Sequence, residues 1–291
     1  MAVEGHIRNP IEWVWDYLKR TKLAAGSAAH SIRGTEQVRH SAPPVVRRIA
    51  PAELRDVLAR GFADFAAYRT DVIFFSIIYP VVGLVLARLA AGYDMLPLIF
   101  PLASGFALVG PVAAVGLYEM SRRREQGVDI TWADAFGVVR SPALGAIIVL
   151  GLLLLAIFLL WLVAAYAIYE ITLGPQPPAS IASFARDVFT TGAGWTLIGV
   201  GVSVGFLFAL LVLTISVVSF PLLLDRDVGL YTAVMTSIRA VRANPAPMAI
   251  WGLIVAGGLV IGSIPLLLGL AIVMPVLGHA TWHLYRKVVP R

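Results

Sequence analysis

Two histidines near the C-terminus have the spacing of metal or haem ligands. His279 and His283 are four positions apart, so a helix projects both rings from one face. A mononuclear zinc site needs further ligands, and the chain has no cysteine to supply one. Bis-histidine haem needs ligands on opposite sides of the ring, which one helix face does not provide. We therefore expect no metal and no cofactor, and interpret the pair, with Trp282 and Tyr285, as an aromatic and basic anchor at a membrane boundary.

A second charged cluster follows a long apolar stretch. Glu119 precedes Arg122 and Arg123 at helical spacings, which favours an ion pair between Glu119 and Arg123. The plain interpretation is anchoring by basic residues at the end of a membrane helix. The functional alternative is a site for phosphate or an anionic lipid headgroup.

The apolar stretches hold almost no ionisable side chain that could serve a reaction or a proton pathway. Arg88, Glu119 and Glu170 all lie near the ends of such stretches, where their side chains can reach an interface. A proton-coupled transporter would be expected to carry a carboxylate or a histidine near mid-span. The chain also has no Walker loop, nucleophile elbow or zinc-protease helix. We expect no catalytic residues and no enzymatic activity.

The composition is that of a membrane protein. The chain of 291 residues is 59% hydrophobic and 14% charged, with a mean hydropathy of +0.83. A membrane helix needs about 20 apolar residues to cross about 30 Å of hydrocarbon. Six apolar stretches come near or exceed this length, although the fifth is short: 72–93, 95–118, 143–168, 195–224, 247–261 and 265–283. The sequence predicts an all-α bundle of six transmembrane helices, arranged as three hairpins.

The basic residues give this bundle an orientation. Of the 23 lysines and arginines, 21 fall in segments that six spans would place on one side, and only Arg88 and Arg186 fall on the other. The positive-inside rule then predicts that both termini lie in the cytoplasm. The net charge of +6 suits anionic lipid headgroups rather than nucleic acid.

Each predicted hairpin is preceded by a short amphipathic segment, which indicates a threefold internal repeat over 51–291. In the first, Leu54, Leu58, Phe62 and Phe65 follow the helical period and are expected to be buried. The second covers 131–139. The third is expected to bury Leu230, Val234, Ile238 and Val241, and to expose Arg239, with Arg242 near its end. Ser141 and Asn244 each precede a proline and are predicted N-caps.

Residues 1–50 differ from the rest of the chain. Positions 9–22 have the pattern of an interfacial helix, in which Trp13 and Trp15 lie above basic residues. That helix either lies on the membrane or docks on a partner, or the segment is a frayed tail. From 24 to 50 the composition is that of a cytoplasmic linker.

Small and helix-breaking residues predict two features within the spans. Pro101 and Pro111 predict a bend in the second span. The pairs Gly201–Gly205 and Gly258–Gly262 have the spacing that permits close helix approach.

Several motifs resemble a bacterial integral-membrane family catalogued as domain of unknown function 2189. They are GLYE at 116–119, SRR at 121–123, LDRD at 224–227, ANP at 243–245 and GHATWHLYR at 278–286. The resemblance runs from about residue 54 to the C-terminus and implies a proteobacterial inner-membrane protein, with no assigned active site. The family is sometimes labelled cytochrome c oxidase related, but a catalytic subunit would need many histidines in the membrane, and the predicted spans of this chain contain only His279 and His283.

Three functions are compatible with these patterns. The first is a non-enzymatic accessory, assembly or structural subunit of a larger respiratory or photosynthetic membrane complex. The second is a small transporter or lipid-handling permease that uses the bent second span as a gate. The third is a metal or haem protein that uses His279 and His283. The residues expected to contact a partner or lipid are Trp13, Trp15, Glu119, Arg122, Arg123, Arg239, Arg242, Trp282 and Tyr285.

Overall fold

The structure is a computed structural model that describes residues 44–67, 81, 83–85, 88, 95–128 and 132–291. Every regular element in this part of the chain is a helix. Trp13 and Trp15 lie outside the described residues, as does most of the first predicted span.

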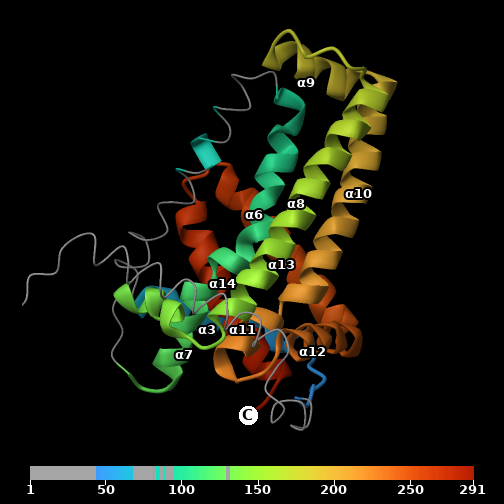
Figure 1. Ribbon diagram of the computed structural model, residues 1–291. Helices are drawn as coiled ribbons and strands as arrows, with labels where there is room; N and C mark the ends of the chain where they lie inside the picture. Colours follow the sequence, from blue (N-terminus) through green and yellow to red (C-terminus); the bar gives the residue numbers. More distant parts are fainter. Residues whose placement is uncertain (1–43, 68–80, 82, 86–87, 89–94, 129–131) are drawn as a thin grey trace, which may run out of the picture.

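Four long helices stand side by side and form the body of the molecule (Figure 1). They are α6 (Ile99–Ala113), α8 (Leu144–Thr172), α10 (Gly192–Ser216) and α13 (Pro245–Ser263), and the short 3-10 helix η1 (Leu96–Leu98) precedes α6. With 29 residues, α8 is about 44 Å long at about 1.5 Å per residue, which exceeds the hydrocarbon thickness.

Four helices in the described residues are long and apolar enough to cross a membrane. They cover Leu96–Ala113, Leu144–Thr172, Gly192–Asp225 and Pro245–Ser263, and correspond to the second to fifth predicted spans. The sixth predicted span coincides in part with α14 (Leu270–Val288), which does not meet the same criteria. The polar second half of α14 explains this difference. The arrangement of six spans in three hairpins therefore stays a prediction.

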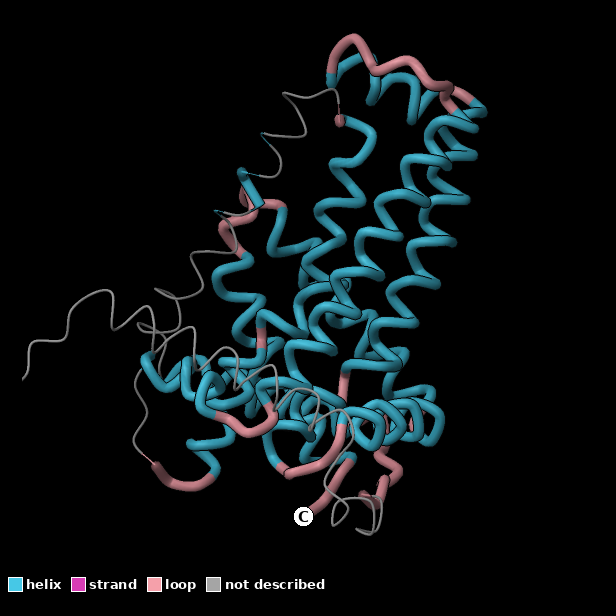
Figure 2. Tube along the Cα trace, in the orientation of Figure 1, coloured by secondary structure: helices cyan, strands magenta, loops and turns pink. Residues whose placement is uncertain are grey.

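Most of the short helices gather at one end of the long ones, in a layer that we call the basal layer (Figure 2). It comprises residues 44–50, α3 (Glu53–Ala67), α7 (Val115–Glu125), α11 (Ser219–Asp225), α12 (Leu230–Ala243) and the second half of α14. The 3-10 helix η2 (Trp132–Arg140) lies beside α7, and α9 (Ile181–Thr190) joins α8 to α10 at the opposite end.

The second predicted span is interrupted where the prolines predicted a bend. Pro111 lies inside α6, which ends at Ala113, and α7 begins at Val115. Proline has no backbone N–H and its ring crowds the preceding turn, so a helix bends or stops near it.

Trp161 fixes the packing of three of the long helices. Its ring, on α8, lies 5.6 Å from the ring of Phe208 on α10, and its Nε1 donates to Ser104 Oγ on α6 at 2.8 Å. Gly205 leaves room for this ring, because a Cβ there would lie 3.1 Å from the Trp161 side chain. Gly201 has no such neighbour. Of the pair Gly201–Gly205, only Gly205 therefore permits a close helix contact among the described residues.

The second glycine pair is used at both positions. A Cβ at Gly258 would lie 3.2 Å from Val273, and one at Gly262 would lie 2.9 Å from Leu270. Both contacts are with α14, so the small residues let α13 and α14 approach closely.

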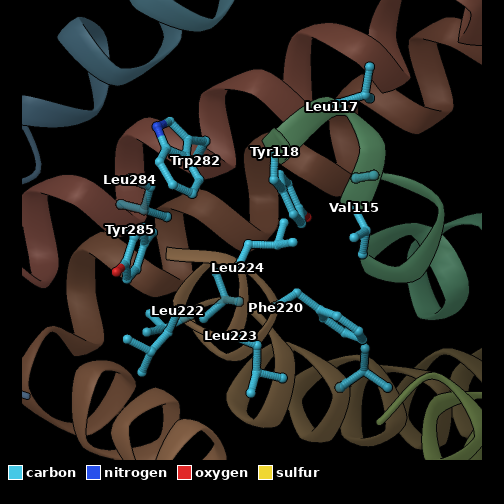
Figure 3. Packing of buried hydrophobic residues seen from close by; sticks show 14 of the residues in the cluster. Val115, Leu117, Tyr118, Phe220, Leu222, Leu223, Leu224, Trp282, Leu284 and Tyr285 are labelled. Atoms are coloured by element: carbon cyan, nitrogen blue, oxygen red, sulfur yellow. The ribbon is translucent and has the colours of Figure 1, made fainter. Parts of the chain in front are cut away.

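The basal layer has its own apolar core beneath the long helices. Large side chains converge there from α7, α11 and α14 (Figure 3). Those of Phe220, Leu222, Trp282, Leu284 and Tyr285 are all fully buried. Trp282 and Tyr285 also contact each other, with ring centroids 5.4 Å apart.

The end of the predicted linker also belongs to the basal layer. Ile49 is buried, and the Arg47 N–H donates to the Val288 carbonyl at 2.8 Å. The Asn244 side chain accepts from the Ile49 N–H at 2.7 Å and donates to the Arg47 carbonyl at 3.1 Å. Asn244 stands at the predicted N-cap position of α13, but its side chain holds this segment instead of capping the helix.

Candidate functional site

The polar side chains of the basal layer meet in three clusters, and the most buried is built around Asp64. The Asp64 cluster consists of Asp64 on α3, Ser121 and Arg124 on α7, and His279 and His283 on α14. Asp64, Ser121 and His279 are buried. The cluster therefore joins three helices that are distant in the sequence.

Asp64 is the acceptor for most of this cluster. Its Oδ2 accepts from Ser121 Oγ at 2.6 Å and from His283 Nε2 at 2.8 Å, and its Oδ1 accepts from Arg124 at 2.8 Å. Burial raises the pKa of the Asp64 carboxyl, but the hydrogen bonds from His283 and Ser121 outweigh burial and hold the pKa below its usual value. Asp64 is thus a buried carboxylate that remains ionised at neutral pH.

The same hydrogen bonds assign the proton on His279. Ser121 Oγ has one hydrogen, and the ionised Asp64 can only accept, so Ser121 donates to Asp64. His279 Nδ1 lies 2.8 Å from Ser121 Oγ and must then donate to it. A neutral ring with its proton on Nδ1 leaves Nε2 as an acceptor, and Nε2 is buried without a hydrogen-bond partner.

Serine, histidine and aspartate are the residue types of a catalytic triad, but here they are hydrogen-bonded to one another in a different order. In a triad the histidine removes the serine proton and the aspartate orients the histidine. Here Ser121 donates to Asp64, so no base is placed to activate its oxygen. Ser121 and His279 are also both buried. This geometry holds helices together and does not prepare a nucleophile.

The two histidines share one face of α14, but different partners hold their rings. Ser121 contacts His279, and Asp64 contacts His283. Within the described residues, no group of three or more histidine, aspartate or glutamate side chains is placed to hold a metal ion.

The second cluster confirms the ion pair predicted for Glu119. Its buried carboxylate accepts from Arg123 Nε at 2.8 Å, and from Arg122 through two nitrogens at 2.8 and 2.9 Å. Arg123 also contacts Asp134 of η2 at 2.5 Å. Gly137 makes room for Arg123, because a Cβ there would lie 2.5 Å from the guanidinium.

This pairing bears on the anion site that the sequence suggested at Arg122 and Arg123. Both guanidinium groups already contact internal carboxylates, so they are compensated within the chain. The contact between Arg123 and Asp134 joins α7 to η2, whereas the contacts of Glu119 lie within α7.

The third cluster surrounds the C-terminal aromatic residues. Tyr285 donates to Asp225 at 2.7 Å, and Trp282 Nε1 donates to Glu125 at 3.2 Å. Arg286 contacts both of these carboxylates, at 3.3 Å from Asp225 and 3.1 Å from Glu125. The sequence placed Trp282 and Tyr285 at a membrane boundary as contacts for lipid or a partner. Instead, the structure buries both rings in the basal core, because the carboxylates of α7 and α11 satisfy their polar atoms.

The structure corrects the predicted buried face of α3. The buried positions are Leu54, Val57, Gly61, Asp64 and Phe65, whereas the side chain of Phe62 is exposed. A Cβ at Gly61 would lie within 2.5 to 2.7 Å of Ala280 atoms on α14. Leu54 and Phe65 are therefore buried as predicted and Leu58 is half-buried against the core, whereas the close approach of Gly61 and the contacts of Asp64 turn α3 away from Phe62.

Arg239 and Arg242 differ from the other predicted site residues. Both are exposed on α12, and neither forms an ion pair with a described residue. They are the members of the predicted set that the described structure leaves accessible and uncompensated.

Sequence reasoning missed Asp64, Ser121, Glu125 and Asp225 as functional positions. Asp64 could have been found, since it lies next to Phe65 on a mostly apolar helix and α14 carries two histidines one turn apart. The roles of Glu125 and Asp225 depend on residues that are 60 or more positions away. No pattern of neighbouring residues predicts contacts over such a separation.

Comparison with known proteins found a family whose model matches the central part of the chain. Residues 99–225 match the model of a family described as predicted integral membrane protein (DUF2189). The match confirms the resemblance that the motifs indicated, and the chain is an integral membrane protein with several apolar helices. Searches of curated proteins and of solved structures found no match.

The DUF2189 segment runs from α6 to α11 and carries part of each polar cluster. It includes Glu119, Ser121 and Asp225, but not Asp64 or His279. The Asp64 cluster is therefore formed between the matched segment and the helices on either side of it.

Proposed function

We propose that the protein is a non-enzymatic accessory, assembly or structural subunit of a respiratory or photosynthetic complex in a bacterial inner membrane. The main support is the placement of its charges. Within the four described candidate spans, the only acidic or basic residues are Glu170 and Asp225, and both lie at helix ends. A proton or ion pathway is expected to place ionisable groups deeper in the membrane. Association with a partner needs none there.

The pairing within the basal layer also supports a structural role. Asp64, Glu119, Glu125 and Asp225 each contact at least one arginine, and these contacts join α3, α7, α11 and α14. A layer in which carboxylates and cations compensate each other is suited to hold a fixed surface. It offers little that could bind and release a transported ion.

We further propose that the basal layer faces the cytoplasm. The described lysines and arginines lie in this layer or in its loops, apart from Arg88 and Arg186. This distribution follows the positive-inside rule. Both termini would then be cytoplasmic, and the N-terminal segment with Trp13 and Trp15 would extend from the same side, where a partner could contact it.

The experiment is purification from native membranes with quantitative mass spectrometry. The full chain, tagged at its C-terminus, is extracted in a mild detergent and separated by size. We expect subunits of one respiratory or photosynthetic complex to elute with it at a constant molar ratio. If only a free monomer or homo-oligomer elutes, in detergent and also in polymer-extracted native discs, the proposal is wrong.

A further inference from the structure

Helix α12 contacts the rest of the protein through its smallest residues. It lies across the lower ends of the long helices and contacts α10 and α11 (Figure 1). Its buried residues are Ala233, Thr236, Ser237 and Ala240, which share one side of the helix. Ser237 Oγ accepts from the Val218 N–H at 3.3 Å, at the junction of α10 and α11. The sequence had predicted burial of Leu230, Val234, Ile238 and Val241. Leu230, Val234 and Val241 are half-buried against the core, but Ile238 does not pack against it, so α12 is rotated away from Ile238.

This rotation leaves a mixed apolar and basic stripe without a described partner. Tyr231, Met235, Ile238 and Arg242 recur at spacings of three and four, so they follow one side of the helix. Tyr231 is 74% exposed, whereas Met235 and Ile238 are half-buried but are not among the residues that form the apolar core or pack against it. Arg239 lies beside this stripe and is also exposed.

The charge of the stripe is uncompensated. Helix α12 has no acidic residue, and Arg239 and Arg242 form no ion pair with a described residue. The nearby Asp225 is already occupied by Tyr285 and Arg286. An anionic surface would complement the two guanidinium groups without breaking any internal pair.

The position of α12 indicates that this anionic surface is the layer of lipid headgroups. A helix that lies across the ends of membrane-spanning helices is level with lipid headgroups if those helices span the bilayer. Its apolar side chains then reach the acyl region, while arginine side chains extend to the phosphates. A tyrosine at this depth has its favoured environment, with an apolar ring and a polar hydroxyl.

We propose that α12 binds anionic phospholipid headgroups through Arg239 and Arg242, with Tyr231, Met235 and Ile238 against the acyl chains. This inference goes beyond the proposed function, because it holds whether or not the protein joins a complex. It names a lipid class and two residues that select it.

The test compares lipids that contact the purified full chain in vesicles. The protein is reconstituted in phosphatidylcholine with a small fraction of spin-labelled phosphatidylglycerol or spin-labelled phosphatidylcholine, and the motionally restricted fraction of each label is measured. Each basic residue near the headgroups contributes about 1 kcal/mol of attraction to anionic lipid, so we expect a selectivity for phosphatidylglycerol of about five- to thirtyfold at the α12 site. The Arg239→Gln/Arg242→Gln variant should lose most of it.

Two control variants separate this site from general charge effects. Arg55→Gln changes an exposed arginine on α3 in the same layer, and Arg186→Gln changes one on α9 at the opposite end. Both should retain the selectivity. Because all four arginines are exposed, folding should be preserved, and an unchanged unfolding midpoint verifies this.

Four results would overturn the proposal. The first is equal restriction of the two lipid labels by the wild type. The second is an equal loss in the control variants. The third is displacement of the lipid by millimolar inorganic phosphate, which would show a site for free phosphate. Retained selectivity in the double α12 variant would also overturn it, and would leave a protein partner as the occupant of this stripe.

Discussion

His283 Nε2 lies 2.8 Å from Asp64 Oδ2, although 219 residues separate the two in the chain. This contact joins the last helix to the first described one and lies one turn from the close approach of Gly61 to Ala280. It also places a carboxylate where Ser121 and Arg124 reach it. Asp64 is therefore the common acceptor through which α3, α7 and α14 are joined in the basal layer.

Replacing Asp64 should destabilise the protein strongly. In Asp64→Asn the neutral amide no longer compensates Arg124 and cannot accept every bond that the carboxylate accepts. Breaking a buried ion pair costs about 3–5 kcal/mol, and Arg124 is half-exposed, so we expect about 2–4 kcal/mol. Thermal unfolding in detergent measures the change.

Asp56→Asn is the matched control for this variant. Asp56 lies on the same helix and pairs with Arg60 and Lys287, but its side chain is 46% exposed, so its loss should cost less than about 1 kcal/mol. Equal destabilisation by the two variants would contradict the role assigned to Asp64.

The contribution of Asp64 should disappear in acid. Its folded pKa is lower than its unfolded value, which is about 3.9, so its stabilising effect is complete above that pH. The effect is lost as the pH falls through the folded pKa. The difference in unfolding midpoint between wild type and Asp64→Asn should be largest near neutrality and should shrink below about pH 4. A difference that stays constant from pH 7 to pH 3 would refute this linkage.

Gly61 should not tolerate even a methyl group. A Cβ there would lie 2.5 Å from the Ala280 Cβ and 2.6 Å from its backbone nitrogen, so α3 must shift. We expect Gly61→Ala to cost about 1–3 kcal/mol, measured as a lower unfolding midpoint. Gly201→Ala is the control, because nothing lies within 4 Å of a Cβ at that position. It should be neutral or slightly stabilising, since alanine favours helix more than glycine does.

The hydroxyl of Tyr285 should contribute to stability. Tyr285→Phe keeps the buried ring but removes the donor to Asp225, so we expect a loss of about 1–3 kcal/mol. Tyr231→Phe removes a hydroxyl from an exposed ring and should change the unfolding midpoint little. The reverse order of effects would show that the contact with Asp225 does not stabilise the layer.

The N-terminal tryptophans offer a test of association. If the segment with Trp13 and Trp15 docks on a partner, the Trp13→Ala/Trp15→Ala variant should reduce the amount of the partner complex that co-purifies. Trp195→Ala is the control, since this exposed ring lies at the far end of α10. Partner recovery that is unchanged by the double variant would assign docking to another surface.

Much of the local structure could be predicted from neighbouring residues. The second to fifth apolar stretches correspond to the four candidate spans, because span length depends only on a run of apolar side chains. The contact between Glu119 and Arg123 follows from helical spacing alone. The break after Pro111 follows from the missing N–H of proline.

The orientation of the amphipathic helices could not be predicted in the same way. On α3 the apolar pattern favoured burial of Phe62, yet Asp64 is buried and Phe62 is exposed. On α12 the pattern favoured Ile238, yet Ala233 and Ala240 form the contact. In both cases small residues let the helix approach its neighbours closely. Hydrogen-bond partners outside the helix satisfy the polar side chains that this approach buries, Asp64 on α3 and Ser237 on α12.

The sequence by itself determined that this is a helical membrane protein, where its apolar helices lie and which charges pair within one helix. These properties depend on side chains fewer than about five positions apart, or on the length of an apolar run. Only the tertiary structure decided that Asp64 meets His283, that Tyr285 meets Asp225, and that Arg239 and Arg242 remain uncompensated. Such pairings depend on which helices pack together, and packing brings side chains from distant parts of the chain within hydrogen-bonding distance.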